Sequence, residues 1–398
     1  MKLLVVATEI PASSDLPGCP RLFNICLELA KRHDITLAII SNDELSLPLP
    51  DSHYLKQAFQ QIVHIKTPDY KPDVVARTFH HLFFASQDDW RWQFPEELGT
   101  IRRQLEKLLQ DHDSLLVRGL KAAQFLGKRP AERTVLDLGD CESSLYLKAG
   151  GNENLPLGKR LKCVFTALGL AEMERKLLSP YDVVVLISEK DARALEFTNP
   201  RTLNSVIANG VDTTYFEYHE INERDSARLL FTGLMGYTPN ADAAAHFAKN
   251  IFPLIRARRP DATFQIVGAH PPAEILTLAS LPGVEVIPDV HDLRPYLYQA
   301  SVYVSPIRLG SGMKNKVLAA MSCGIPVVAS SGSTNGIEAL PMEHILVADE
   351  EPDFADSVVT LLDNVYMRSE IARKARHLVE RAYSWQASAS LFEALLFP

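Results

Sequence analysis

A short glycine-containing loop joins an expected strand to an expected helix in the stretch SPIRLGSGMKNKVLAAMSCG. The strand ends at Ser305 and the helix begins near Met313, with Gly310 and Gly312 between them. Glycines let backbone N–H groups approach an anion closely, and the first helical turn adds unpaired donors and a partial positive charge. The pattern indicates a cradle for a diphosphate, although the same glycines would also suit a tight turn without a ligand.

Three basic side chains surround this loop. Arg308 precedes the glycines, and Lys314 and Lys316 follow them. Charge-assisted hydrogen bonds to phosphate are stronger than bonds between neutral groups. These three positive charges would therefore suit a bound diphosphate. The alternative is that the lysines form a solvated first helical turn.

The elements that must position this loop are predicted from hydrophobic patterning. Short runs rich in Val, Ile and Leu alternate with longer amphipathic segments along almost the whole chain. This alternation is typical of parallel sheets covered by helices, and it occurs in two similar halves. Ligands of open α/β sheets bind at the carboxyl ends of strands, which is where the glycine loop lies.

The domain organisation follows from composition along the chain. A length of 398 residues with 46% hydrophobic content is enough for two cores. A polar, acidic stretch separates the halves and predicts an exposed linker. The expected domains are residues 1–212 and 228–382, the expected linker is 213–227, and a last amphipathic helix in 383–398 could pack on either domain.

Overall charge and cysteine content exclude several classes of protein. A net charge of −8 and a pI near 5.9 argue against a nucleic-acid partner. No apolar run approaches the roughly 20 residues needed to cross a bilayer, and the start MKLLVVATEIP resembles a buried strand rather than a signal peptide. Five scattered cysteines without a close pair favour reduced thiols, with neither a disulfide framework nor a metal site. The predicted location is the cytoplasm.

Two further regions leave alternatives open. Residues 56–112 contain many His and aromatic side chains without clean periodicity, and these could line an acceptor pocket or pack in a core. Lys159, Arg160 and Lys162 would face water or an anionic membrane surface. Peripheral contact with the inner membrane is thus an open possibility at this point.

Four ordered stretches of the second half match a known family in sequence and spacing: LLFTGLMGYTPNADAAAHF, IFPLIRARRPDATFQIVG, VIPDVHDLRPYLYQASVYVSPIRLGSGMKNKVLAAMSCGIPVV and EHILVAD. The chain resembles the retaining glycosyltransferases of family 4. The resemblance implies the GT-B fold, an α/β class in which two Rossmann-like domains face an interdomain cleft. It implies a nucleoside-diphosphate sugar in the second domain, an acceptor in the first, and no cofactor or metal.

The resemblance also implies site residues. It makes Arg308, Lys314 and Lys316 candidate catalytic residues, which would stabilise the departing diphosphate. On the donor side they are Gly233 near the phosphates, Val286 and Asp289 in the loop that touches the base, and Gly310, Ser311 and Gly312 against the diphosphate. On the acceptor side they are Gly18 and Arg21 in the loop ASSDLPGCPRLFN, and Asp137 and Asp140 in DLGDCESS. The two aspartates could meet an acceptor hydroxyl or serve in caps and turns.

The sequence departs from the family at two places. Many members carry two glutamates eight positions apart, the second gripping ribose hydroxyls, where this chain has Ser311 and Ala319. Loss of such a carboxylate, worth about 2 to 3 kcal/mol, would weaken donor binding about 30-fold to 150-fold. Asn335 stands where an acidic residue is common, and nearby Glu338 could compensate. The sequence does not distinguish natural drift from an engineered change at Ala319.

Two functions follow from the resemblance and its departures. The first is a glycosyltransferase that moves a sugar to a glycan, a lipid-linked molecule or a small-molecule acceptor in polysaccharide or glycolipid synthesis. The second is a catalytically silent GT-B protein that acts as a binding or regulatory partner. An epimerase or phosphorylase is disfavoured, because neither the epimerase carboxylates nor a cofactor-lysine motif is recognisable.

Overall fold

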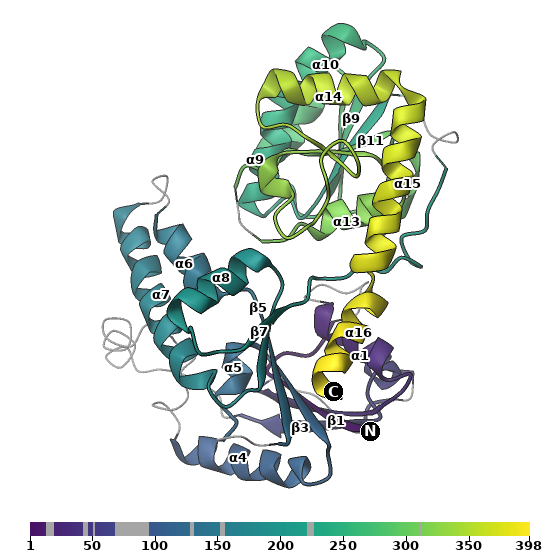
Figure 1. The fold of residues 1–398 in the computed structure, drawn as a ribbon. Helices are drawn as coiled ribbons and strands as arrows, with labels where there is room; N and C mark the ends of the chain where they lie inside the picture. Colours follow the sequence, from purple (N-terminus) through teal and green to yellow (C-terminus); the bar gives the residue numbers. More distant parts are fainter. Residues whose placement is uncertain are drawn as a thin grey trace. The chain divides into compact units, whose positions relative to one another are not determined.

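The computed structural model describes residues 1–12, 20–42, 47–50, 52–67, 95–127, 131–151, 156–220, 227–309 and 312–398. Gly18, Gly310 and Ser311 lie outside the described residues, as does much of the aromatic region in 56–112. The chain forms two compact units: Met1–Ala208 with Ser388–Pro398, and Asn209–Ala387. Both termini therefore belong to the first unit (Figure 1).

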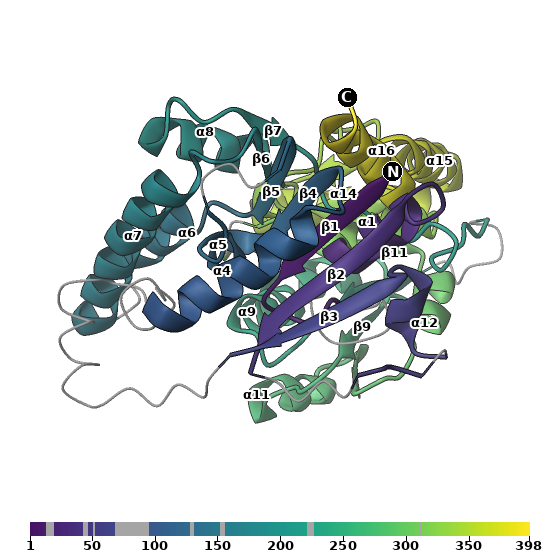
Figure 2. The same cartoon turned by 90° about the horizontal axis from the view of Figure 1, so that it is seen from below.

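The first unit is built on a seven-stranded parallel sheet with the strand order β3-β2-β1-β4-β5-β6-β7 (Figure 2). Most of its strands are apolar on both faces, as expected for strands covered by helices on each side. The strands are β1 (Lys2–Ala7), β2 (Asp34–Ser41), β3 (Gln61–Lys66), β4 (Ser114–Arg118), β5 (Arg133–Gly139), β6 (Val183–Leu186) and β7 (Asn204–Val206).

Helices flank this sheet, and four of them share one apolar core with it. These four are α4 (Pro95–Leu109), α5 (Gly119–Ala123), α7 (Leu157–Leu177) and α8 (Glu189–Thr198). The remaining helical segments are α1 (Arg21–Leu29), a 3₁₀ turn at Tyr54–Gln57, α6 (Glu142–Gly150) and most of α16 (Trp385–Leu396).

The second unit is a six-stranded parallel sheet in the doubly wound order β10-β9-β8-β11-β12-β13. Its strands are β8 (Arg228–Thr232), β9 (Thr263–Gly268), β10 (Val284–Pro288), β11 (Val302–Ser305), β12 (Val327–Ala329) and β13 (Leu346–Val347). The chain reverses its direction of winding between β8 and β11, and ligands of such sheets bind beyond the strand ends at this point.

Aromatic packing fixes the helices of the second unit on its sheet. Phe247 contacts Phe252, Phe264 and Phe354, which come from three different elements. The helices are α9 (Thr238–His246), which continues through a π turn (Phe247–Ile251) into α10 (Phe252–Arg258), then α11 (Ala273–Leu276) with a 3₁₀ turn (Thr277–Ser280), α12 (Arg294–Gln299), α13 (Asn315–Ser322), a 3₁₀ turn (Ser331–Ser333), α14 (Glu351–Asp363) and α15 (Val365–Ala382).

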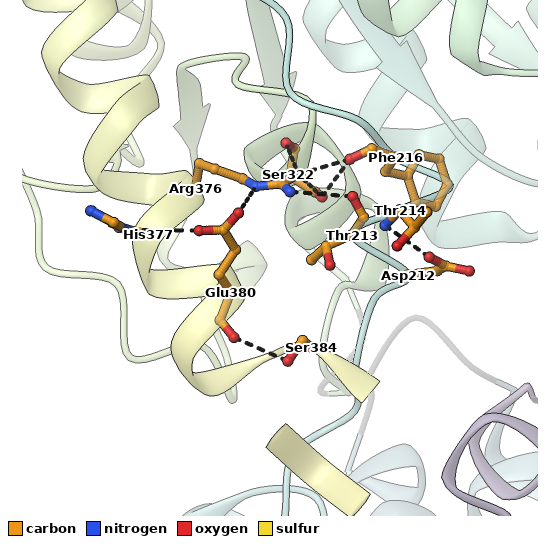
Figure 3. Close-up of polar contacts among 9 residues, drawn as sticks. All are labelled: Asp212, Thr213, Thr214, Phe216, Ser322, Arg376, His377, Glu380 and Ser384. Atoms are coloured by element: carbon orange, nitrogen blue, oxygen red, sulfur yellow. Dashed lines mark hydrogen bonds and ion pairs between the residues drawn. The ribbon is translucent and has the colours of Figure 1, made fainter. Parts of the chain in front are cut away.

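The start of the predicted linker belongs to the second unit. Arg376 on α15 donates to the carbonyl oxygens of Thr213 at 3.2 Å, Phe216 at 2.9 Å and Ser322 at 2.7 Å, and it pairs with Glu380 at 2.7 Å (Figure 3). A guanidinium has enough donors in a fixed plane to hold several carbonyls at once. The unit therefore begins at Asn209 rather than at residue 228.

The end of the chain falls mainly in the first unit, which is one of the two placements that the sequence leaves open. Helix α16 begins at Trp385, and its residues from Ser388 onward pack in the first unit. Within that unit, Phe392 is fully buried and Glu393 pairs with Arg32 at 2.7 Å. The predicted fold class, two parallel α/β sheets, is confirmed.

Candidate functional site: the strand ends of the second unit

Two glycines come together where β8 and β9 end. A Cβ atom on Gly268 would lie 1.7 Å from the carbonyl oxygen of Gly233, so this close approach of the two backbones requires glycine. A Cβ on Gly233 would instead lie 2.8 Å from both Asn240 Nδ2 and Lys316 Nζ. Gly233 therefore leaves room for two polar side chains at the end of β8, the strand beside the winding reversal.

Lys316 occupies the first turn of α13 and points to this same place. Its ammonium donates to Asn240 Oδ1 at 2.6 Å and lies 4.5 Å from the centre of the Phe231 ring. Asn240 in turn donates to the carbonyl of Leu234 at 2.9 Å. Burial and the nearby positive charge of Lys314 lower the pKa of Lys316 to about 7. No carboxylate of the described residues bonds to this desolvated cation, whose partner is a neutral amide, so the site is well suited to receive an anion.

The other two candidate catalytic residues have protein partners. Lys314 directly precedes α13 and donates to the carbonyl of Gly312. Arg308 forms an ion pair with Asp242 on α9, with Nη2 and Oδ1 2.8 Å apart, and about half of its side chain is exposed. An exposed pair of this kind is weak, so Arg308 can exchange Asp242 for another anion at small cost.

Buried serines hold the loop that follows β11. Ser330 Oγ donates to the carbonyl of Ile307 at 2.6 Å, and Ser333 Oγ donates to that of Ser305 at 2.6 Å. Gly332 allows the approach, since a Cβ there would lie 2.8 Å from the Ile307 oxygen. These bonds fix the backbone just before Arg308, and a preorganised backbone is what anion binding by a loop requires.

Ala319 shares a face of α13 with Lys316. It follows Lys316 by three residues and Asn315 by four, which places the three on one side of the helix. This side is partly accessible, whereas Val317 and Leu318 are buried. A longer side chain at position 319 would therefore extend from the accessible face that carries Lys316.

The residues predicted to contact the donor from neighbouring loops bind or pack against other parts of the protein in the structure. Asn335 Nδ2 donates to the carbonyl of Gly332 at 3.1 Å, and Glu338 is exposed, with its backbone N–H donating to Tyr383 Oη at 2.7 Å. Val286 is partly buried against the core in β10. Asp289 has a φ of +51° and accepts the backbone N–H of His270 at 2.8 Å. Their contacts with a donor stay predictions.

In the first unit, two of the predicted acceptor residues bind each other. Arg21 Nε lies 3.0 Å from Asp137 Oδ2, and both side chains are completely or almost completely buried. Arg21 also donates to the carbonyls of Ile207 and Ala208 at 2.9 and 3.0 Å. Asp140 is half-buried directly after β5. Because Arg21 and Asp137 are buried and bonded to each other, they have a structural role in this conformation. They join α1 and β5 to the backbone of Ile207 and Ala208.

Sequence reasoning missed several residues that shape the candidate site at these strand ends. Asn240, Asp242 and the three serines 305, 330 and 333 were not singled out, although each contacts a candidate residue or fixes its loop. Their place in the sequence could have identified Asn240 and Asp242, because both lie within the first five residues of the helix that follows Gly233. In the described part of the chain, no three His, Cys, Asp or Glu side chains converge as metal ligands would.

The two glycines give a paired prediction. Gly268→Ala should prevent stable folding of the second unit, because its Cβ meets backbone that cannot move away. Gly233→Ala should fold, because its Cβ meets the ends of two flexible side chains, although it should displace Lys316 from Asn240. Thermal melting checks both variants; a Gly268→Ala variant that melts like the parent would contradict this geometry.

Comparison with known proteins identifies similar sequences and structures. Residues 226–364 match the family model of glycosyl transferases group 1. A Klebsiella pneumoniae protein described as an uncharacterized 44.6 kDa protein in the cps region is 20% identical over 409 residues, covering 98% of this chain and 99% of that protein.

Solved structures match over the full length at low sequence identity. Sucrose-phosphate synthase of Thermosynechococcus elongatus has a TM-score of 0.67 at 12% identity, covering 99% of this chain and 98% of that one. Anabaena HepE in complex with UDP has a TM-score of 0.63 at 13% identity, with the same coverage. A variant of S. aureus TarM in complex with Fondaparinux, α-GlcNAc-glycerol and UDP has a TM-score of 0.64 at 12% identity, covering all of both chains.

The two parallel α/β sheets and these matches define a protein of the GT-B fold. Residues 226–364, which lie in the second unit, are similar to the glycosyl transferases group 1, in line with the resemblance of the sequence to the family-4 glycosyltransferases. None of the helices in the described ranges is long and apolar enough to span a membrane.

Proposed function

We propose that the protein is a retaining glycosyltransferase that uses a UDP-sugar and acts in the synthesis of a polysaccharide or glycolipid. The observation that carries the proposal is the cluster of Gly233, Asn240 and Lys316 at the strand ends beside the winding reversal. The cluster lies inside the region that matches the family model.

The charges support a diphosphate as the bound group. The ammonium of Lys316 hydrogen-bonds to an amide oxygen, so an arriving phosphate needs to displace only a neutral partner. Lys314 and Arg308 lie on the two sides of the loop containing Gly312, and α13 begins directly after Lys314. Positive charge and a helix N-terminus would together stabilise negative charge on the departing diphosphate as the bond to the sugar breaks.

The similar proteins support a uridine-containing donor and a polysaccharide product. HepE and TarM are both described as complexes with UDP, which favours uridine as the base. The location of the Klebsiella relative in a cps region favours a polysaccharide product. The donor sugar and the acceptor hydroxyl would be selected by side chains of the loops around the site.

A silent binding protein is the second candidate, and Ala319 together with Asn335 is the observation that favours it. Neither position supplies a carboxylate, and the Asn335 amide is already bonded within its own turn. Slow hydrolysis of UDP-, GDP- and ADP-sugars, measured alongside thermal shifts, separates the two functions. Release of nucleotide from one donor supports the enzyme; a thermal shift without any release supports the silent protein, and absence of both excludes a donor site.

Ala319→Glu should tighten binding of the UDP-sugar. The new carboxylate would extend from the accessible face that carries Lys316 and could accept two ribose hydroxyls, which would improve affinity by up to about 30-fold. Isothermal titration of Ala319→Glu measures the gain. Ala319→Gln is the matched control, since it adds similar volume without charge and should gain much less. Equal affinities for the parent and the Glu variant would show that position 319 does not face the ribose.

A further inference from the structure

Helix α7 of the first unit is apolar on two opposite sides. Its inward side packs into the core through Ala167, Leu170, Met173 and Leu177. Its outward side carries four large apolar side chains that are 50 to 68% exposed: Leu157, Leu161, Phe165 and Leu168. With 3.6 residues per turn, these four fall within about 80° of one another, on the side opposite the buried residues. We call them the outer stripe.

The neighbouring helix adds to the exposed apolar surface. Helices α6 and α7 lie side by side (Figure 1), and Arg160 Nε donates to the carbonyl of Gly150 at 3.2 Å where α6 ends. On α6, Tyr146 and Leu147 are 44% and 57% exposed. Scattered exposed apolar residues are ordinary, but a continuous stripe of four on one helix face marks a surface that meets an apolar partner.

The charge around the outer stripe is positive. Lys159, Arg160 and Lys162 lie between its first and third members, and no acidic residue occurs in α7 before Glu172. Helical geometry places Arg160 on one flank of the stripe and Lys162 on the other. The whole chain has a net charge of −8, so this region is opposite in sign to the protein as a whole.

We propose that the outer stripe docks on the surface of an anionic lipid bilayer, with α7 lying in the plane of the interface. An apolar stripe flanked by basic residues is the pattern of interfacial helices, whose apolar side chains enter the headgroup boundary while Lys and Arg meet anionic lipids. The stripe runs for about 17 Å along the helix, from Leu157 to Leu168. This proposal is independent of the donor site, which belongs to the other unit.

Sedimentation with vesicles tests the proposal on the full-length protein. The parent should bind vesicles of phosphatidylcholine mixed with phosphatidylglycerol, and bind poorly to phosphatidylcholine alone. Leu161→Ser with Leu168→Ser should lower binding to the mixed vesicles at least about tenfold, because less apolar surface enters the interface. Arg160→Gln with Lys162→Gln, which removes the two basic residues that flank the stripe, should lower it about 25-fold, at about fivefold per charge, and should reduce its dependence on salt.

Phe197→Ser is the matched control, because Phe197 on α8 is 90% exposed in the same unit but lies outside the stripe. It should leave vesicle binding unchanged. UDP-glucose binding and thermal melting of every variant show whether the fold and the donor site persist. The proposal is overturned if the parent does not bind the mixed vesicles, or if the two serine substitutions leave binding intact. It is also overturned if the parent self-associates through the stripe, so that the same substitutions convert a dimer to a monomer in sedimentation velocity.

Discussion

Lys316→Ala should lower kcat for sugar transfer or donor hydrolysis by about 100-fold or more, with little change in thermal stability. In the structure, this ammonium lies at the end of β8 beside Gly233 and bonds to Asn240, and within the described ranges no carboxylate pairs with it. Its removal leaves the departing diphosphate without its nearest cation. Steady-state kinetics with a UDP-sugar measures the loss, and Lys249→Ala, an exposed lysine of the same unit, is the control that should behave like the parent.

The pH dependence of donor binding belongs to the same prediction. Because burial lowers the pKa of Lys316 to about 7, the ammonium loses its proton as the pH rises through neutrality. At the proposed donor site the protonated form would bind the diphosphate, so affinity for UDP-glucose should fall about tenfold per pH unit above about pH 7. Lys316→Arg should bind with little pH dependence over this range, because arginine keeps its charge. A parent whose affinity is flat from pH 7 to 9 would contradict this assignment.

Asp137→Asn should destabilise the first unit by about 3 to 5 kcal/mol, the second large effect expected. Burial by itself raises the pKa of Asp137, but Arg21 and Arg118 offset this effect, and the pKa lies below its usual value. The amide would leave the buried guanidinium of Arg21 without its counter-ion while preserving the shape of the side chain. Calorimetric melting of the variant should show this loss as a lower transition temperature.

The control for Asp137→Asn is Glu172→Gln, which removes a carboxylate that pairs with Arg175 and Lys176 on the exposed surface of α7. It should cost less than about 1 kcal/mol. The pH dependence has a defined sign. The folded pKa of Asp137 is depressed, so its stabilisation is present above the unfolded pKa and is lost as the pH falls toward the folded value. If Asp137→Asn and Glu172→Gln melt at the same temperature, the buried pair of Arg21 and Asp137 does not stabilise the unit.

The fold could be predicted well because hydrophobic runs of strand length alternate regularly with amphipathic segments. Lys316 could also be predicted, because its place in the first turn of α13 follows from the strand-loop-helix pattern. Its partner Asn240 lies 76 positions away in the sequence, and only the pairing of β8 with β11 brings the two together. No local pattern carries that information.

The domain boundary and the roles of the predicted acceptor residues were harder to predict from the sequence, because both depend on contacts between distant residues. The polar composition of residues 213–220 suggests a free linker, yet Arg376 holds the backbone carbonyls of Thr213 and Phe216, and composition says nothing about backbone partners. The family resemblance places Arg21 and Asp137 on the acceptor side. Their burial as a pair depends on contacts across 116 positions, which sequence spacing does not reveal.

A crystal structure of the protein soaked with UDP tests the central claim most directly. We expect the diphosphate between the loop that follows β8 and the first turn of α13, with a phosphate oxygen about 3 Å from Lys316 Nζ and Asn240 displaced from that ammonium. A nucleotide ordered elsewhere on the protein, with the bond between Lys316 and Asn240 intact, would contradict the claim that these strand ends form the donor site.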